Sequence, residues 1–336
     1  MRRKHGNILR QKNLCNVSNC NYNYDLCPIV SISCQNNNIG FSPGSCTIFA
    51  TSYGEKTLFG NSEDYNDPET YCWVEPRSEG NYGRVYVGYG NFYPQGGINE
   101  KGLAMDGNAL PPSALNLHPE LPPPNESVLR TIMKKAANVE KAIEIAVKYR
   151  RDNGGIPMRY QIFLADANGD AVVMSAGADG ELAFTRKEEG DGYLVSTNFN
   201  RANPENGEYP CWRYDTVVWR LDEIENEDDL TVDYFKSILD AVHIESPYDP
   251  GISIQTLHSN IFDLRNGVIY LYYWGQFDEV MILDVEELIN EGTFLSRIED
   301  LFSEETYEGT STGTDSSGGC FIATAAFEPF TCYARR

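Results

Sequence analysis

Apolar residues take up a regular spacing only from Cys46 onward. In the first half of that region the pattern predicts short strands, with Gly54 as the turn between the first two. The predicted strands are Cys46–Tyr53, Thr57–Asn61, Arg84–Tyr89 and Gly102–Asp106. Residues 1–45 are rich in Asn and Cys and follow neither a helical nor a strand period, so we interpret them as a leader.

Two Asn-Gly pairs predict β-hairpins in the second half of the chain. One lies at Asn168-Gly169 within residues 160–176, and the other lies within residues 254–274. Two further strands are expected in residues 180–200, and one in "VMILDV" after the second hairpin.

Helical spacing appears in four places. Residues 126–135 and 139–150 form a first pair, with Asn138 as the N-cap of the second helix. Residues 214–224 and 232–242 form another pair, and Thr231 is the expected cap. Two blocks of strands with helical pairs between them predict an α+β fold in which helices cover sheets.

Two segments interrupt or follow this pattern. The proline-rich stretch at residues 110–127 is too long for a simple connection, which is typical of functional or disordered loops. After Phe302 the sequence turns to Glu, Thr, Ser and Gly, and it ends in the apolar box "GGCFIATAAF". We therefore expect a leader at 1–45, a folded domain at 46–302, and a flexible linker with its terminal box at 303–336.

Charge and hydropathy narrow the class of partner. The formal net charge of −22 argues against a nucleic-acid partner, which needs clustered Lys and Arg. No apolar run approaches the roughly 18 residues of a membrane helix. "MRRK" at the start resembles the basic end of a signal peptide, but no uninterrupted apolar segment follows. The compartment stays open, an extracytoplasmic location included.

The nine cysteines are unevenly distributed. Those at 15, 20, 27 and 34 lack the paired spacing of a zinc ribbon, which favours an oxidisable or divergent leader over a metal site. Cys72 and Cys211 each adjoin a Trp in the expected domain, as two buried thiols or one disulfide.

Cys46 itself is a candidate nucleophile or a small buried residue at the start of a strand. A nucleophilic thiol needs a base and donors for the oxyanion. None of the four histidines, at 5, 118, 243 and 258, lies in a context that marks it as this base. The α-amino group of a chain beginning at Cys46 is the alternative, because its ordinary pKa is about 7.7–8.0. It requires cleavage between Ser45 and Cys46.

Four segments from Cys46 to about Asp284 resemble, in order, the landmarks of the cysteine N-terminal nucleophile hydrolases. They are "CTIFATSYGEKTLFGNSEDY", "GGINEKGLAMDGNALP", "YLVSTNFN" and "CWRYDTVVWRL". This group includes choloylglycine hydrolases, penicillin V acylases and acyltransferases acting on 6-aminopenicillanic acid. The resemblance implies an αββα sandwich of two antiparallel sheets between helix layers. It also implies attack of a cysteine on a linear amide.

The resemblance also implies roles for individual residues. Cys46 is the nucleophile and, through its freed amine, its own base; Asp64 orients that amine. Asn198 supplies an oxyanion donor, and Arg213 contacts the active centre, where its charge favours the thiolate. Asn108 fits as a second oxyanion donor only with a one-residue shift, because Ala109 otherwise occupies that place.

One departure concerns charge near the thiol. Relatives often carry "GRNxDW" after the first hairpin, whereas this chain has "GNSEDY", with Asn61 in place of the Arg. The thiol loses an expected cationic neighbour, and its pKa is expected to be lowered less. The two departures, at Asn61 and Asn108, point away from the bile salt and penicillin V branches.

The function expected from the sequence is therefore hydrolysis of a small N-acyl amide through an acyl-thioester, without metal or organic cofactor. An acyltransferase with the same intermediate and an inactive secreted binding protein are the alternatives, and a homo-oligomer stays open. The aromatic residues of 82–93 are candidates for an acyl pocket or for sheet packing.

Overall fold

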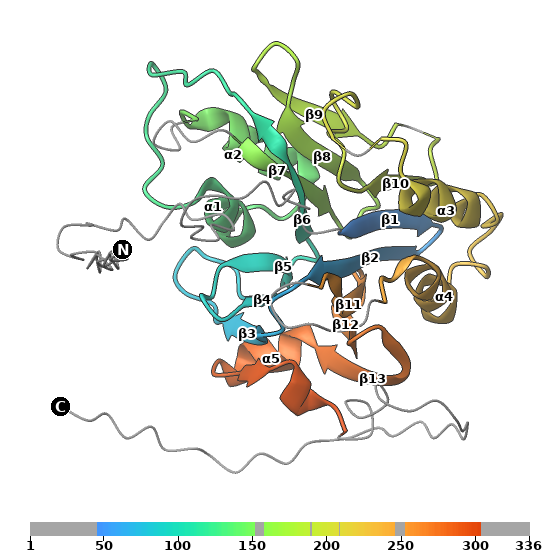
Figure 1. The fold of residues 1–336 in the computed structure, drawn as a ribbon. Coiled ribbons are helices and arrows are strands. Elements are labelled where there is room, and N and C mark those ends of the chain that lie inside the picture. The colour runs from blue at the N-terminus through green and yellow to red at the C-terminus, as the bar shows by residue number, and fades with distance from the viewer. Residues whose placement is uncertain (1–45, 152–157, 189, 208, 246–252, 304–336) are drawn as a thin grey trace, which may run out of the picture. The chain divides into compact units, whose positions relative to one another are not determined.

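Two antiparallel sheets lie face to face in the computed structural model, and helices cover their outer faces (Figure 1). The structure describes residues 46–151, 158–188, 190–207, 209–245 and 253–303. The predicted leader, its four cysteines, and all of the predicted linker and terminal box except Ser303 lie outside these residues.

The first sheet has six strands in the order β10-β1-β2-β11-β12-β13 within the described residues. Their bounds are β1 Thr47–Tyr53, β2 Lys56–Tyr65, β10 Tyr193–Ser196, β11 Gln255–Asp263, β12 Val268–Tyr273 and β13 Gln276–Asp284. Gly54, at φ 55°, makes the tight turn between β1 and β2, where a side chain would be strained. Both strands are interior strands of the sheet, so their backbones are paired on both sides.

The second sheet has eight described strands in the order β14-β3-β4-β5-β6-β7-β8-β9. Their bounds are β3 Thr70–Glu75, β4 Arg84–Tyr89, β5 Pro94–Asn99, β6 Ala104–Ser113, β7 Met158–Ala165, β8 Ala171–Ala176, β9 Leu182–Arg186 and β14 Leu295–Arg297. The predicted hairpin at Asn168-Gly169 is confirmed as the β7–β8 connection.

The predicted helices are confirmed with small shifts at their ends. Their bounds are α1 Val128–Lys135, α2 Val139–Lys148, α3 Trp212–Leu221 and α4 Val232–Val242; a further helix, α5, spans Val285–Glu291. The Asn138 side chain accepts a hydrogen bond from Lys141 N–H, and Thr231 accepts one from Tyr234 N–H, so both predicted caps are confirmed.

Three apolar clusters hold the layers together. One lies between the sheets and combines residues such as Ile48 and Phe59 with Val85 and Phe163. The second joins α1 and α2 to the eight-stranded sheet, and the third joins α3 and α4 to the six-stranded sheet. The layers therefore follow the expected αββα order, which Figure 1 shows with α3 and α4 beside β1 and β2.

The structure differs from the sequence prediction at several strands, and β3 and β14 were not predicted. β2 runs to Tyr65 rather than to Asn61, because Ser62, Glu63 and Asp64 are buried by the other strands. β6 extends to Ser113, into the predicted proline-rich loop. β5 was not predicted, because its Gly96-Gly97 pair has weak strand propensity. At Gly97 a Cβ would lie 2.6 Å from the Val85 carbonyl oxygen, so close strand packing requires glycine there.

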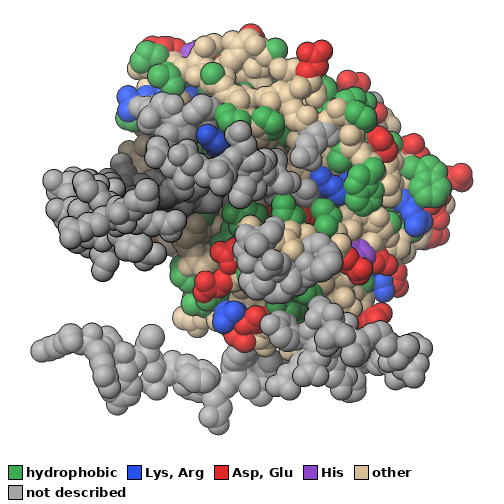
Figure 2. Space-filling view, viewed as in Figure 1, with side chains coloured by type: hydrophobic (Ala, Val, Ile, Leu, Met, Phe, Trp, Pro, Cys, Tyr) green, Lys and Arg blue, Asp and Glu red, His purple; other side chains and the backbone are tan. Residues whose placement is uncertain are grey.

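Three further observations concern the cysteines, the surface charges and the apolar character of the helices. Cys72 and Cys211 are buried free thiols, which resolves the two alternatives left by the sequence. On the face in Figure 2, Lys and Arg side chains lie as separate spots among acidic and apolar ones. Among the described residues, no helix combines the length and the apolar character needed to cross a bilayer.

Candidate active site

Cys46 lies immediately before β1, and only 4% of its surface is exposed. β1 and β2 are antiparallel, with Thr47 opposite Ser62. One further step along this register places Cys46 opposite Glu63, and directly opposed residues project from the same face of a sheet. The β1–β2 hairpin thus positions a carboxylate beside the thiol.

The thiol and this carboxylate are in contact. The Cys46 Sγ–H donates to Glu63 Oε2 at 3.5 Å, and the Tyr89 hydroxyl donates to Glu63 Oε1 at 2.5 Å. Tyr89 comes from β4 of the opposite sheet, so Glu63 is held between the two sheets. Burial raises the pKa of Glu63 to about 7, although these two hydrogen bonds lower it.

A second carboxyl group completes this acidic cluster. Asp106 on β6 is 1% exposed, and its Oδ1 accepts from the backbone N–H of Gly107 at 2.6 Å. Its Oδ2 accepts no hydrogen bond from the described residues. Burial and the charge of Glu63 hold the pKa of Asp106 well above its usual value.

These surroundings disfavour a pre-formed thiolate. Burial raises the pKa of the Cys46 thiol well above its usual value, and the charges of Glu63, Asp64 and Asp106 raise it further. The hydrogen bond from the Asp64 backbone N–H lowers it only in part. The thiol therefore has to lose its proton to a base as it reacts.

The backbone carbonyl of Cys46 is held by two side-chain donors. Arg213 Nη1 donates to Cys46 O at 2.9 Å, and Asn108 Nδ2 donates to the same oxygen at 3.2 Å. Arg213 Nη1 also donates to Thr47 Oγ1 at 3.1 Å. The expectation that the guanidinium favours the thiolate stays a prediction. In this geometry Arg213 holds the backbone carbonyl of the cysteine.

Arg213 also connects the other predicted residues. It lies in the first turn of α3 and is buried; its Nη2 donates to Asn198 Oδ1 at 3.0 Å, and its Nη1 lies 3.7 Å from Asp64 Oδ2. Asp64 Oδ1 accepts a 2.5 Å hydrogen bond from the Thr256 hydroxyl. Burial raises the pKa of Asp64 to about 8, against the lowering effects of Arg213 and Thr256.

The two asparagines are oriented by further hydrogen bonds. Asn108 Oδ1 accepts from Ser196 Oγ at 2.5 Å, and Asn198 Nδ2 donates to the carbonyl of Ala109 at 3.0 Å. The buried Gln161 donates to the carbonyls of Thr197 and Phe199 on either side of Asn198. Each amide plane is therefore fixed before any substrate enters.

The departure at Asn61 has a structural counterpart. Asn61 Oδ1 accepts from Asn260 Nδ2 at 3.0 Å across the β2–β11 pair. Asn260 also contacts His258 Nδ1 at 3.1 Å, and burial lowers the pKa of His258 to about 4. A neutral amide and imidazole network thus occupies this face where relatives often carry an arginine.

The structure brings the other four predicted site residues together around Cys46. The sequence prediction gave no site role to Glu63 or Asp106, and it considered Tyr89 only for an acyl pocket or for sheet packing. Glu63 was visible as the first residue of the Glu-Asp pair in "GNSEDY", and Asp106 lay inside "GGINEKGLAMDGNALP" with no role assigned to it. Of the aromatic residues considered for a pocket, Tyr89 contacts Glu63, and Tyr86 packs on Trp73 with ring centroids 5.6 Å apart.

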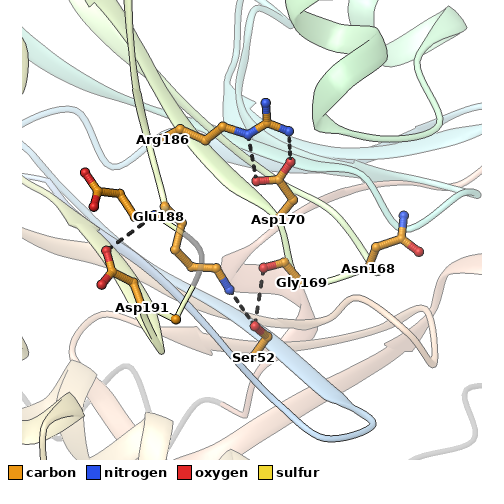
Figure 3. Close-up of a pocket in the computed structure, with 9 residues that line it drawn as sticks. Ser52, Asn168, Gly169, Asp170, Arg186, Glu188 and Asp191 are labelled. Carbon is orange, nitrogen blue, oxygen red and sulfur yellow. Dashed lines mark hydrogen bonds and ion pairs between the residues drawn. The ribbon is translucent and has the colours of Figure 1, made fainter.

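A surface hollow of about 720 Å³ lies elsewhere, beside Ser52 at the far end of β1 (Figure 3). Ser52 is six residues from Cys46 along an extended strand, which corresponds to about 20 Å. The basic groups there are already paired, with Arg186 on Asp170 and Lys187 on Ser52. The hollow is therefore separate from the cysteine site.

Comparisons with known proteins agree with this fold. A conjugated bile acid hydrolase from Clostridium perfringens superimposes with a TM-score of 0.56 and 16% identity, over 75% of this chain and 95% of the other. Penicillin V acylase from Agrobacterium tumefaciens gives a TM-score of 0.53 and 19% identity, over 74% and 90% of the two chains. A search of the curated proteins found no match.

Membership of a family rests on a match over most of the domain. The sequence model of the acyl-coenzyme A:6-aminopenicillanic acid acyl-transferase family matches residues 53–279, more than half of the chain. This range contains Asp64, Asn108, Asn198 and Arg213 and begins within β1. The chain therefore belongs to the acyl-coenzyme A:6-aminopenicillanic acid acyl-transferase family.

Proposed function

We propose that the chain hydrolyses linear amides of small N-acylated amines, with Cys46 as the nucleophile after residues 1–45 are removed. The observation that carries this proposal is the setting of Cys46. Its carbonyl is held by Arg213 and Asn108, and its thiol lies against a carboxylate. A cysteine needed only for packing at the start of a strand requires none of these contacts.

In the proposed reaction, the freed α-amine of Cys46 accepts the thiol proton. Its ordinary pKa of about 7.7–8.0 suits a base acting near neutral pH. Asp64 is proposed to orient this amine. Its Oδ2 accepts no hydrogen bond from the described residues and is paired only with Arg213 at 3.7 Å, so it retains capacity for a further donor.

The sulfur then attacks the amide carbonyl. The oxyanion that forms needs hydrogen-bond donors that do not themselves ionise. We assign this role to the amide groups of Asn198 and Asn108, whose orientation is fixed by Arg213 and Ser196. Collapse of the adduct releases the amine with one proton and leaves an acyl-thioester on Cys46. Water hydrolyses the thioester and restores the thiol.

The substrate class is supported by the proteins of like fold. Two of them are named for the hydrolysis of conjugated bile acids and of penicillin V. The family name supports a second function, transfer of the acyl group to an amine. Both functions use the same thioester and differ in whether water or an amine attacks it.

The first test is the mass and N-terminal sequence of the purified full-length chain. Processing predicts a chain that begins Cys-Thr-Ile-Phe, and Cys46→Ala is expected to retain residues 1–45 and to release no amine from an N-acyl anilide. Cys72→Ala removes another buried thiol, in the opposite sheet. This variant is expected to be cleaved before Cys46 and to release the amine, as the wild type is. Full hydrolysis by the Cys46→Ala chain would refute the assignment.

A second experiment separates the two reactions. The processed chain is incubated with penicillin V, conjugated bile acids and simple N-acyl anilides, with and without hydroxylamine as an acceptor. Hydrolysis predicts free acid as the main product, and transfer predicts acyl hydroxamate in excess. Unchanged binding of one of these amides by wild type and Cys46→Ala, with no product from either, would instead identify a binding protein.

A further inference from the structure

Glu63 occupies the position from which a base can act on the thiol before any free amine exists. While Cys46 follows Ser45 in the chain, its nitrogen is an amide and cannot accept a proton. Two described groups contact Sγ, the Asp64 backbone N–H and the Glu63 carboxylate, with Oε2 at 3.5 Å, and of these only the carboxylate can accept a proton. Cleavage of the chain therefore needs a base that turnover of the processed chain does not need.

We propose that Glu63 is the catalytic base that removes the Cys46 thiol proton during self-cleavage of the Ser45–Cys46 bond. The inference rests on the proposed function, because it concerns the step that produces the catalytic amine. Tyr89 and Asp106 act through Glu63 and are positioning residues. Tyr89 fixes Oε1 at 2.5 Å, which leaves Oε2 directed at the sulfur.

The bonds and protons balance in this step. Glu63 takes the proton from Sγ, and the sulfur adds to the carbonyl carbon of Ser45. The carbon–nitrogen bond then breaks, and the proton passes from Glu63 to the nitrogen of Cys46, which becomes a free amine. The product is a thioester between Ser45 and Cys46. One water hydrolyses it to a Ser45 carboxylate and the Cys46 thiol.

The groups that face Glu63 favour this role. Cys46, just before β1, faces it together with Tyr89 on β4 and Asp106 on β6. Asp64 and Tyr65 follow it on β2. His258 is opposite it on β11, but its pKa is lowered to about 4, which makes it a weak base. Burial brings the pKa of Glu63 to about 7, so the carboxylate forms near neutral pH and is a stronger base than an exposed one.

The test follows cleavage of the full-length chain by intact mass after cell-free synthesis, from pH 5.5 to 8.5. The wild-type rate is expected to rise through pH about 7 and then level off. Glu63→Gln is expected to lower the rate at least about 100-fold and to remove this rise, as expected for the loss of a general base. Glu75→Gln neutralises a partly buried carboxylate at the far end of β3 and serves as the matched control.

Two further measurements separate base chemistry from misfolding. Glu63→Asp keeps a carboxylate and is expected to retain part of the rate with its pH rise. Hydroxylamine cleaves a thioester once it has formed. Glu63→Gln is expected not to form the thioester, so hydroxylamine is expected to leave its chain uncleaved. Cleavage of Glu63→Gln within a few-fold of wild type, or its full recovery with hydroxylamine, would overturn the inference.

The inference and the proposed function fail in different ways. A wild-type chain that never cleaves at Ser45–Cys46 overturns the inference, whatever amides the chain hydrolyses. Glu63-dependent cleavage in a chain that releases no amine from any amide tested supports the inference and refutes the proposed hydrolase.

Discussion

Arg213 Nη1 lies 3.7 Å from Asp64 Oδ2, and both side chains are buried beside the backbone of Cys46. The same Nη1 donates to the carbonyl of Cys46 at 2.9 Å. One guanidinium on α3 therefore compensates the carboxylate of β2 and fixes the residue that precedes β1. Stability and positioning of the cysteine depend on the same side chain.

Replacing Arg213 with Ala is expected to lower the free energy of unfolding by about 3–5 kcal/mol, because it leaves a buried carboxylate without its partner. Urea unfolding at pH 9, above the pKa of about 8 of Asp64, measures the loss. Arg220→Ala on the same helix removes a half-exposed ion pair with Glu223 and a contact with the ring of the exposed Trp219, and it is expected to cost about 1 kcal/mol. Equal losses in the two variants would contradict the structural role of Arg213.

Stability is expected to fall as the pH rises toward neutrality. The pKa of Glu63 is about 7 in the folded chain and about 4.5 in the unfolded chain. The protonated carboxyl therefore stabilises the folded state fully below pH 4.5, and this contribution is lost as the pH rises to 7. The difference of about 2.5 units corresponds to about 3 kcal/mol, lost between pH 4.5 and 7. Asp64, with a pKa of about 8, extends the decline.

Urea unfolding at pH 5, 6, 7 and 8 checks the direction of this change in stability, in a Cys46→Ala background that is expected to keep residues 1–45 attached. Adding Glu63→Gln removes one titrating carboxyl and is expected to flatten the profile below pH 7. A double variant with the same slope as the single one would show that Glu63 ionises normally in the folded chain.

Asn198→Ala is expected to lower kcat for amide hydrolysis by about 10²–10³-fold, as expected for the loss of an oxyanion donor. Asn200→Ala is a matched control, because Asn200 is also buried and donates to the Ala176 carbonyl, at 2.7 Å. That variant is expected to lose stability while keeping kcat within a few-fold. Similar kcat losses in both would indicate a structural role for Asn198.

The space beside Asp106 can be tested with two glycines on neighbouring strands. A Cβ at Gly96 would lie 2.5 Å from Asp106 Oδ2, whereas a Cβ at Gly107 would meet nothing closer than 3.4 Å. Gly96→Ala is therefore expected to cost about 1–3 kcal/mol and to slow cleavage at Cys46. Gly107→Ala is expected to change stability by less than about 1 kcal/mol. The reverse order in urea unfolding would contradict the placement of Asp106.

Local patterns in the sequence were sufficient for most elements of the fold. Asn138 and Thr231 cap helices as predicted, and Asn168-Gly169 turns a hairpin, because these features depend on residues only a few positions apart. The αββα layers and the site residues Asp64, Asn108, Asn198 and Arg213 followed from an ordered resemblance between distant motifs. Their chemical roles stay predictions.

Pairing between distant strands decided the features that local patterns did not reveal, β5 and the place of β10 in the sheet order. Strand propensity did not reveal β5, because its two glycines are required by neighbouring strands: Gly97 by the close approach of β4, and Gly96 by Asp106 on β6. Similarly, β10 follows β9 in the chain but pairs with β1 in the other sheet, a crossover that no local pattern encodes.

The sequence by itself determined the nucleophile candidate and the residues expected around it, because these are carried by motifs of adjacent residues. Only the tertiary structure decided the acidic surroundings of the thiol. Glu63, Tyr89 and Asp106 come from three strands in two sheets, and each carboxyl has a raised pKa because the packed sheets exclude water from it. Burial of this kind arises only when distant segments meet, so its effect on Cys46 is a property of the folded chain.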